Sequence, residues 1–349
     1  MGENTIPATL IAGFVCVILV VALRPLAIAH NLVDRPGGRK RHVGHVPVIG
    51  GVCMFGAVLV GAPLAVPTVQ TFFLMLGCAL LVFFGVIDDR YDLPASVRFG
   101  AQFAAVLLMV FGGSVMVATI GAPFFGGEIF VGSFSLLLTV FLSTALINAI
   151  NMTDGMDGLA SGMSLIALLG LVVAGYGTAV ADMALVGFAA VAGFMAFNFP
   201  LRSNRTVRTF MGDAGSTFLG FFIAWQCIAI SQPPVAALSP VAVLGLIAMP
   251  LYDLTSCFFR RIAAGRSPFS ADRNHFHHVL LEAGLKRRPI LAMLLGFGVV
   301  VATLTLSLTH LGYNDGVILL VWLACGVFID IALRAFRSYR LPVTSETSR

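Results

Sequence analysis

The sequence predicts an all-α, polytopic membrane protein, and three observations support this class. Of the 349 residues, 58% are apolar and only 11% are Asp, Glu, Lys or Arg, a balance that exceeds what a soluble core of this size needs. The apolar residues form stretches of about 20, the length of helix that crosses the ~30 Å hydrocarbon core of a bilayer. When these stretches are threaded as successive spans, all 21 Lys and Arg residues fall on one side of the membrane.

We expect eleven membrane-spanning helices, joined by short polar connections. They cover residues 5–28, 47–66, 70–87, 97–119, 129–150, 159–176, 179–200, 214–232, 238–259, 289–310 and 315–336. Residues 1–336 then form a single transmembrane domain, followed by a tail at residues 337–349. All six cysteines lie inside the spans without CxxC spacing, so we expect small buried side chains rather than a metal site.

The distribution of charge predicts the orientation of the chain. The connections on one side carry every basic residue, whereas the opposite side carries the acidic Glu3, Glu128, Asp182 and Asp315. The positive-inside rule therefore places the N-terminus outside and the C-terminal tail in the cytoplasm, as an odd number of spans requires. A net charge of +5 suits anionic lipid headgroups and phosphorylated substrates. Nucleic acid is excluded as a partner, because the basic residues are scattered over short loops.

Five polar segments occur on the basic side, and they contain the residue types that bind phosphate and metal. They are residues 29–46, 88–96, 148–158, 201–213 and 260–288. In the first segment, Arg39, Lys40 and His42 lie among glycines that permit close backbone approach, which suits an oligophosphate. A plain positive-inside anchor is the alternative for this segment.

Two of these segments contain pairs of carboxylates. Asp88 and Asp89 are adjacent at a membrane boundary, where mutual repulsion and desolvation favour a cation or a metal-bound phosphate, although a solvated acidic loop has the same appearance. Asp154 and Asp157 are each followed by glycine, so a turn could direct both carboxylates at one ligand. The same segment contains Asn148 and Asn151, and an ordinary turn between spans does not require either.

The remaining segments combine an aspartate with a cluster of Arg and His residues. Asp213 precedes a span, where it could cap the helix or hold Mg²⁺ while free backbone N–H groups face an anion. In the last loop, His275, His277 and His278 lack the Cys or acidic spacing of a zinc site, so phosphate and sugar hydrogen bonding is favoured. Asp253, within the ninth predicted span, either supports this face or bonds a neighbouring helix.

In this order, the five segments resemble the polyprenyl-phosphate N-acetylhexosamine-1-phosphate transferase family over nearly the whole chain. This family includes the translocase that makes lipid I and the enzymes that initiate O-antigen, common-antigen and teichoic acid synthesis. The stretches DRPGGRKRH and RSPFSADRNHFHH are more similar to the second group than to the translocase. The resemblance implies a multi-pass enzyme of the bacterial inner membrane with its active site on the cytoplasmic loops.

The resemblance also implies the reaction and its cofactor. N-acetylglucosamine 1-phosphate would pass from UDP-N-acetylglucosamine to undecaprenyl phosphate with Mg²⁺, or Mn²⁺ in its place, and UMP would be released. Another UDP-N-acetylhexosamine, of the fucosamine or quinovosamine type, stays open as the donor. A secondary transporter is the alternative from another class, but its polar site would be expected at the bilayer midplane between repeated halves. The abundant glycines are also compatible with a homodimer.

The family's site residues can be carried over to matching positions of this sequence. Asp213 corresponds to the metal ligand, with Asp88 beside it, and Phe210 corresponds to the aromatic residue that stacks on uracil. Asp89, Asp154, Asp157, His275, His277 and His278 complete the implied catalytic set. Substrate binding is implied for Arg39, Lys40, His42, Arg98, Asn148, Asn151, Asn198, Arg260, Arg261, Arg266 and Arg273.

Two points qualify this assignment. Arg98 stands where the family has lysine, so the charge is kept but the geometry of its hydrogen bonds differs. A phosphate monoester is mostly dianionic at neutral pH, because its second pKa is near 6. The role of Asp88 is therefore expected to be positioning or metal binding more than removal of a proton from the lipid phosphate.

Overall fold

The computed structural model describes residues 1–34, 46–124, 126–200, 209–267 and 275–340 of the chain, with side chains up to residue 336. Within these residues, eight helices are long and apolar enough to cross a membrane. They are α1 (Thr5–Ala29), α3 (Val69–Tyr91), α4 (Ala95–Leu107, extended by a π-helical turn to Gly112), α5 (Ser135–Thr153), α7 (Ala179–Asn198), α8 (Gly212–Ser231), α12 (Arg287–His310) and α13 (Asp315–Arg340).

Shorter helices complete the architecture. α2 (Gly50–Ala65) and α6 (Leu159–Ala174) each have 16 residues, which is about 24 Å of helix at 1.5 Å per residue. α9 (Pro240–Leu246) and α10 (Ala248–Ala263) form a pair bent by 89°, and α11 (Phe276–Glu282) follows on the same side of the molecule as the start of α12. The short strands β1 (Val33–Asp34) and β2 (Val46–Pro47) pair antiparallel.

Ten predicted spans fall on one helix each and the ninth falls on the pair α9–α10, but the expectation of eleven full-length spans is not confirmed. By length and composition the described part of the chain has eight candidate spans, or nine if the bent pair is one crossing. The predicted span 238–259 is broken at Ile247, and Pro250 then lies in the first turn of α10, where a missing N–H is tolerated. Apolar composition alone cannot detect such a break, since both halves are hydrophobic.

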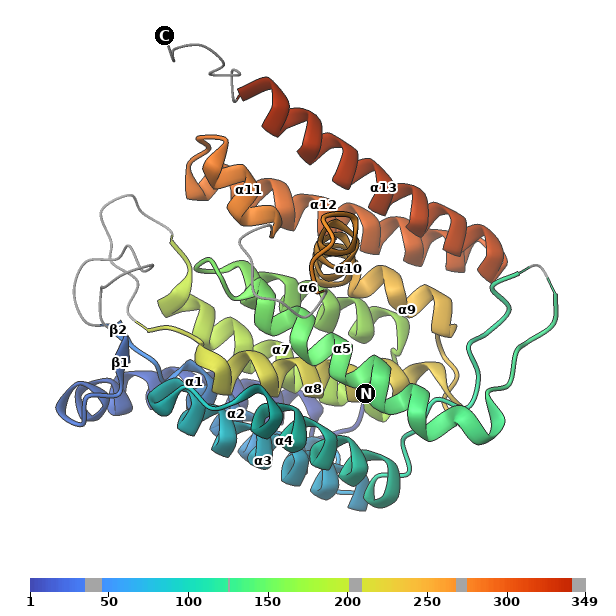
Figure 1. The fold of residues 1–349 in the computed structure, drawn as a ribbon. Helices are drawn as coiled ribbons and strands as arrows, with labels where there is room; N and C mark the ends of the chain where they lie inside the picture. Colours follow the sequence, from blue (N-terminus) through green and yellow to red (C-terminus); the bar gives the residue numbers. More distant parts are fainter. Residues whose placement is uncertain (35–45, 125, 201–208, 268–274, 341–349) are drawn as a thin grey trace, which may run out of the picture.

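The helices run side by side, so that their ends gather at two opposite ends of the molecule (Figure 1). The short ribbon β1–β2 lies at one end, together with the end of α3, the end of α5 and the start of α8. The turn between α12 and α13 lies at the other end. α10 is seen nearly along its axis in this view, because it runs across the direction of the other helices (Figure 1).

α8 is the central helix of the bundle. In its most apolar 18-residue window 89% of residues are buried, against 22% for α1, so α8 is enclosed by protein while α1 faces outward. Its Phe218, Phe221 and Phe222 are fully buried. A side chain at Gly85 of α3 would collide with the backbone of Ala214. This close approach brings the end of α3, with its two carboxylates, to the first turn of α8.

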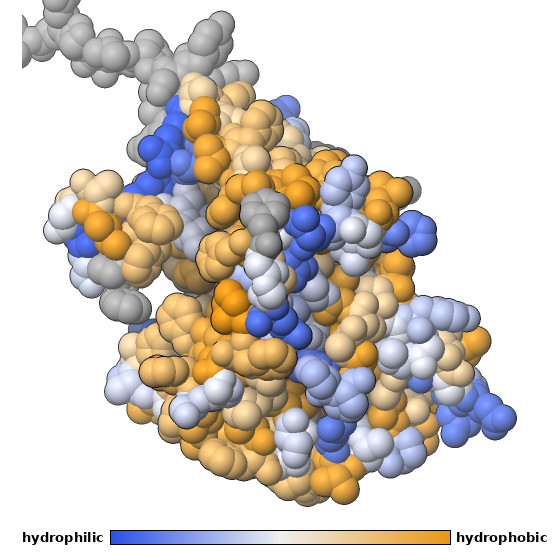
Figure 2. Space-filling model, turned by 90° about the vertical axis from the view of Figure 1, so that its right-hand side faces the viewer, coloured by the Kyte–Doolittle hydropathy of each residue, from blue (hydrophilic) through white to orange (hydrophobic). Residues whose placement is uncertain are grey.

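The surface of the helices is largely apolar, which fits a multi-pass membrane protein. Large side chains are exposed on the outward faces of α1, α5 and α13, for example Phe14, Phe141 and Phe328 at 64–68% exposure. A soluble monomer rarely exposes such extended apolar surface. In Figure 2, which views the end near the α12–α13 turn, hydrophilic residues are scattered between broad apolar areas.

Candidate active site

Asp89, near the end of α3, joins α3 to α8 by accepting hydrogen bonds from the first turn of α8. One of its carboxylate oxygens accepts a hydrogen bond from the backbone N–H of Asp213 at 2.8 Å, and the other accepts from Ala214 at 3.2 Å. Gly212 precedes this turn with φ +71°, and a side chain there would collide with Asp89 and Val48. We expected the N–H groups at the start of α8 to face a substrate anion. In the structure, the anion that they meet is Asp89.

Asp88 is held in a different way from its neighbour. Its Oδ1 accepts from the backbone N–H of Leu93 at 2.7 Å, and its Oδ2 lies 3.5 Å from a guanidinium nitrogen of Arg98. Asp88 is buried, whereas the Arg98 side chain is 44% exposed. Of the two charged groups, the guanidinium is therefore the one that contacts solvent. Arg98, predicted to bind substrate, therefore also fixes the orientation of a site carboxylate.

Asp213 points toward α5. Its Oδ1 accepts a hydrogen bond of 2.6 Å from the Asn151 side-chain amide, which also lies 2.8 Å from the Ser216 hydroxyl. The negative charge of Asp213 acts on Asp88, Asp89 and Asp154. These four carboxylates come from three separate segments of the sequence. They lie close enough together for their charges to act on one another. This convergence was expected from the family resemblance.

Asp154 and Asp157 lie in the turn between α5 and α6. Burial raises the pKa of Asp154 well above its ordinary value, and the charges of Asp213, Asp157 and Asp89 raise it further. The Asp154 side chain makes no hydrogen bond or ion pair with any residue that the structure describes. Asp157 differs, because it lies 3.6 Å from Arg287 at the start of α12. Asp154 is therefore the carboxylate of this turn that is left to bind a cation or substrate.

Two of the asparagines that were predicted to bind substrate make hydrogen bonds within the protein. Asn198 is 3% exposed, accepts from the backbone N–H of Gly158 at 2.8 Å and donates to the Thr209 carbonyl at 3.1 Å. It therefore connects the acidic turn (residues 154–157) to the segment before α8. Its predicted contact with substrate stays a prediction. The amide of Asn148 donates to Gln102 of α4 at 2.8 Å and to the Thr144 carbonyl at 2.7 Å. Asn148 thus joins α4 to α5.

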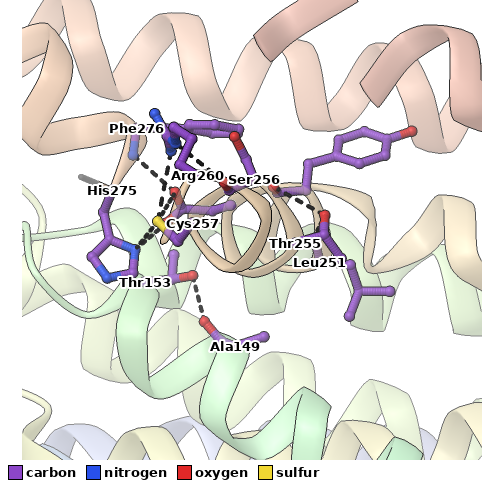
Figure 3. Close-up of polar contacts among 11 residues, drawn as sticks. Ala149, Thr153, Leu251, Thr255, Ser256, Cys257, Arg260, His275 and Phe276 are labelled. Carbon is purple, nitrogen blue, oxygen red and sulfur yellow. Dashed lines mark hydrogen bonds and ion pairs between the residues drawn. The ribbon is translucent and has the colours of Figure 1, made fainter. Parts of the chain in front are cut away.

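A second cluster forms where α10 meets α11. Asp253 binds with both oxygens: Oδ2 lies 3.0 Å from Nδ1 of His275, and Oδ1 accepts from the backbone N–H of Phe276 at 2.8 Å. The Cys257 sulfur lies 3.4 Å from the same His275 nitrogen, as Figure 3 shows. Burial lowers the pKa of His275, but the hydrogen bonds to Asp253 and Cys257 outweigh this effect and raise it to about 10.

His277 joins the two clusters. It is 1% exposed, and neither ring nitrogen has a hydrogen-bond partner among the described residues. A side chain at Gly155 would collide with its Nε2, so the ring lies directly against the acidic turn. Its ring centroid is 4.2 Å from that of His278. Burial, together with the neighbouring His278, lowers the pKa of His277 to about 4, so His277 is neutral at physiological pH.

The predicted basic residues are only partly described. Arg260 donates to the Ser256 carbonyl at 3.1 Å and to the Cys257 sulfur at 3.6 Å, with its guanidinium 5.8 Å from the centre of the Phe276 ring. Arg261 is buried at the end of α10 and Arg266 is exposed beyond it. Arg39, Lys40, His42 and Arg273 lie outside the described residues.

Phe210 occupies the strand-like segment before α8. It forms a parallel bridge with Val48, and its N–H donates to the Pro47 carbonyl at 2.8 Å. These contacts fix the backbone beside Asp213, three residues further on. Its predicted stacking on uracil stays a prediction.

Four further residues of the two clusters, Cys257, Arg287, Gln102 and Ser216, were not predicted, and Asp253 was expected only to support this face or to bond a neighbouring helix. Cys257 and Asp253 are four residues apart on one helical face, a signal that the assumed unbroken span obscured. Arg287 was counted only as a positive-inside charge. Gln102 and Ser216 lie within apolar helices, and nothing in the sequence marks their pairing with asparagines of α5.

The donor atoms of the two clusters suit different ions. Among the described residues, only Asp253, Cys257 and His275 place three ligand atoms within 4.8 Å of one another. Hydrogen bonds from Phe276 and Arg260 already occupy this trio, and the guanidinium charge opposes a divalent cation. The acidic cluster instead offers separated carboxylates. Such a set fits Mg²⁺, which is commonly held by one or two carboxylates with substrate phosphates and water.

Comparisons with known proteins identify the family of the chain. Residues 71–231 match the family described as glycosyl transferase family 4. Three similar proteins are each named undecaprenyl-phosphate alpha-N-acetylglucosaminyl 1-phosphate transferase. That of Escherichia coli K12 is 35% identical over 293 residues, which cover 82% of this chain and 80% of the relative. Those of Yersinia pestis and Haemophilus influenzae are 36% identical over 269 residues (76% and 73% covered) and 34% over 293 residues (82% and 81%).

Proposed function

The chain belongs to glycosyl transferase family 4, and from that premise we propose that it transfers N-acetylglucosamine 1-phosphate from UDP-N-acetylglucosamine to undecaprenyl phosphate. The products are undecaprenyl-diphospho-N-acetylglucosamine and UMP, so the reaction initiates synthesis of a cell-envelope polysaccharide. The observation that supports this proposal most directly is the convergence of Asp88, Asp154 and Asp213 at one end of the bundle.

The reaction requires that two anionic phosphates approach each other. An oxygen of the lipid phosphate attacks the sugar-linked phosphorus of the nucleotide sugar, and the bond from that phosphorus to the UMP oxygen breaks. Unit charges ~4 Å apart repel by roughly 4 kcal/mol at an effective dielectric constant of 20. Catalysis of such a transfer is therefore mostly positioning and neutralisation of charge.

We propose Asp213 and Asp88 as the residues that hold Mg²⁺, with Asp154 beside them. When bound, the cation neutralises phosphate charge, including that on the departing UMP. The raised pKa of Asp154 supports this assignment, because a group of partly buried carboxylates repels itself and a bound cation relieves the repulsion. Asn151 orients Asp213 through its 2.6 Å hydrogen bond, and Arg98 orients Asp88.

The proposed orientation puts this end of the bundle in the cytoplasm of a bacterial inner membrane. The ends of α3 and α5 and the start of α8 lie together, and the threading of the sequence assigns every basic residue to the connections on this side. With α2 and α6 as short crossings and α9–α10 as one broken crossing, the chain crosses eleven times and the N-terminus lies outside. A water-soluble nucleotide sugar then reaches the site from the cytoplasm, and the lipid reaches it from the membrane.

Turnover by the purified protein tests the proposed function. Incubation with UDP-N-acetylglucosamine, undecaprenyl phosphate and Mg²⁺ should release UMP and form a lipid-linked sugar in equal amounts. Omission of the lipid or addition of a chelator should stop both. Absence of UMP under complete conditions would contradict the proposal. Parallel reactions with UDP-N-acetylfucosamine and UDP-N-acetylquinovosamine identify the preferred sugar.

A further inference from the structure

Asp253 connects two helices that are separate in sequence. Its two carboxylate oxygens bind different partners, Nδ1 of His275 at 3.0 Å and the backbone N–H of Phe276 at 2.8 Å. Phe276 is the first residue of α11, so the same carboxylate orients the first histidine of the cluster and anchors the helix that carries the other two. Asp253 is 6% exposed, and this burial keeps competing water away from both bonds.

The 89° bend between α9 and α10 makes this contact geometrically possible. α10 runs across the bundle, so one of its faces is presented to the segment before α11 (Figure 1). Asp253, Ser256, Cys257 and Arg260 occupy positions i, i+3, i+4 and i+7, which is a single helical face. Every member of this face makes a polar contact: Ser256 donates to Asp330 of α13, and Arg260 donates to Cys257.

The hydrogen bond also determines which nitrogen of His275 carries a proton. An ionised carboxylate only accepts, so Nδ1 of His275 must donate, and Nε2 is the ring nitrogen that is not bound to Asp253. A carboxylate in this position also makes the ring more basic. At neutral pH His275 is then an imidazolium, as its pKa of about 10 indicates, and Nε2 is a charged donor suited to a phosphate oxygen.

We infer that Asp253 is a positioning residue for the phosphate transfer: through its two bonds it holds His275 as an Nδ1–H donor and holds α11 in register with the acidic turn. The inference rests on the proposed function and on the expectation from the sequence that the histidine cluster hydrogen-bonds phosphate or sugar of the substrate. Asp253 itself does not need to touch substrate, because both of its oxygens are engaged within the protein.

Kinetics of three variants of the full-length protein test this inference. Asp253→Asn cannot accept at both positions as a carboxylate does, so kcat should fall at least ~10-fold, the scale of a lost general acid–base or positioning contact, with KM for the nucleotide sugar changed less than about threefold. Asp253→Glu keeps the charge and should recover part of the loss. Thr255→Val is the matched control, since Thr255 lies on the exposed face of α10 and bonds only its own helix.

A double variant separates positioning from a general structural effect. If Asp253 acts through His275, then Asp253→Asn should slow His275→Gln little further, because residues that act as one unit are not additive. Losses that multiply, or an Asp253→Asn variant that keeps more than half of the wild-type kcat, would overturn the inference.

A spectroscopic measurement makes the result independent of activity. In protein labelled with ¹⁵N-histidine, the His275 signal, identified by its absence in His275→Gln, should report a protonated Nδ1 that is lost in Asp253→Asn. An unprotonated Nδ1 in the wild type would overturn the inference even if turnover is normal. Conversely, a protonated Nδ1 in a protein that releases no UMP would contradict the proposed function while leaving the Asp253–His275 interaction intact.

Discussion

The Asp89 carboxylate binds the backbone of Asp213, with 2.8 Å between Oδ1 and the amide nitrogen. The two aspartates are thus held together by a helix cap, and the side chain of Asp213 stays directed toward Asn151. Of the adjacent pair Asp88 and Asp89, only Asp88 has its carboxylate outside this cap. Asp88 and Asp89 therefore have different structural roles, although they are adjacent and chemically identical in the sequence.

The cap predicts the effect of replacing Asp89. Asp89→Ala should lower the free energy of unfolding by about 1–2 kcal/mol, because two N–H groups of α8 lose their acceptor. Turnover should fall as well, since Asp213 is in the same turn. Asp89→Asn keeps an acceptor, so it should reduce both the free energy of unfolding and the turnover less than Asp89→Ala does. Thermal unfolding in detergent and UMP release measure the two effects.

Thr178→Ala is the matched control for this prediction. Thr178 caps α7 by accepting from the N–H of Ala181 at 3.3 Å, at the end of α7 opposite to Asn198. It should lower stability by about 1 kcal/mol and leave kcat unchanged. An equal loss of kcat in both variants would mean that Asp89 affects turnover only through global stability.

Replacing Asp213 should remove the metal requirement together with the activity. Asp213→Ala deletes the carboxylate whose charge acts on three neighbouring aspartates, so turnover should fall below a few per cent and added Mg²⁺ should not restore it. A Mg²⁺ titration of UMP release measures this. Ser216→Ala is the control, because it removes the second partner of Asn151 and the hydroxyl's bonds to the Gly212 and Asp213 carbonyls but leaves the Asp213 carboxylate in place; it should keep most of the activity. Activity well above a few per cent in Asp213→Ala would remove it from the metal site.

The membrane class and the positions of the polar segments were predictable, because they depend on composition and on local motifs. Ten predicted spans correspond to one helix each and the ninth corresponds to the pair α9–α10. Asp88, Asp154 and Asp213 come together as the family resemblance implied. Pairings between distant segments were not predictable. Asn198 has the polarity of a substrate ligand in the sequence, but its partners Gly158 and Thr209 become neighbours only after the helices pack.

The break in the ninth predicted span also could not be predicted from the hydropathy of the sequence. Hydropathy averages over the bend at Ile247, so Asp253 was placed inside a straight helix and not beside His275. Pro250 was the local signal for a new helix start, because proline is tolerated in a first helical turn and disfavoured in the middle of a helix. The interaction of α10 with α11 depends on this bend, which only the three-dimensional structure provides.

Gly155 is predicted to be essential for contact between the acidic turn and the histidine cluster. A methyl group in Gly155→Ala would collide with Nε2 of His277, so either the turn or α11 must shift. We expect kcat to fall at least ~10-fold, because small displacements of catalytic groups have large effects on rate. Gly100→Ala on α4 is the control, since its side chain would meet nothing within 4 Å. It should keep full activity and gain up to about 1 kcal/mol of stability. Equal activity of the two variants would contradict the contact.

His277 predicts how stability depends on pH. Its pKa falls from 6.5 to about 4 on folding, so between these values the unfolded chain binds a proton that the folded protein does not. Stability should therefore decrease as pH falls from 6.5 toward 4, by on the order of 3 kcal/mol from this group. The raised pKa of Asp154 acts in the opposite sense above its ordinary value of 3.8, and the raised pKa of His275 acts in the opposite sense near its ordinary value of 6.5. Both groups are present in the wild type and in His277→Gln. The difference between wild type and His277→Gln thus isolates His277. Unfolding in detergent at pH 7.0 and 5.0 should show a smaller loss of stability for His277→Gln, and equal losses would mean that His277 is accessible to protons in the folded state.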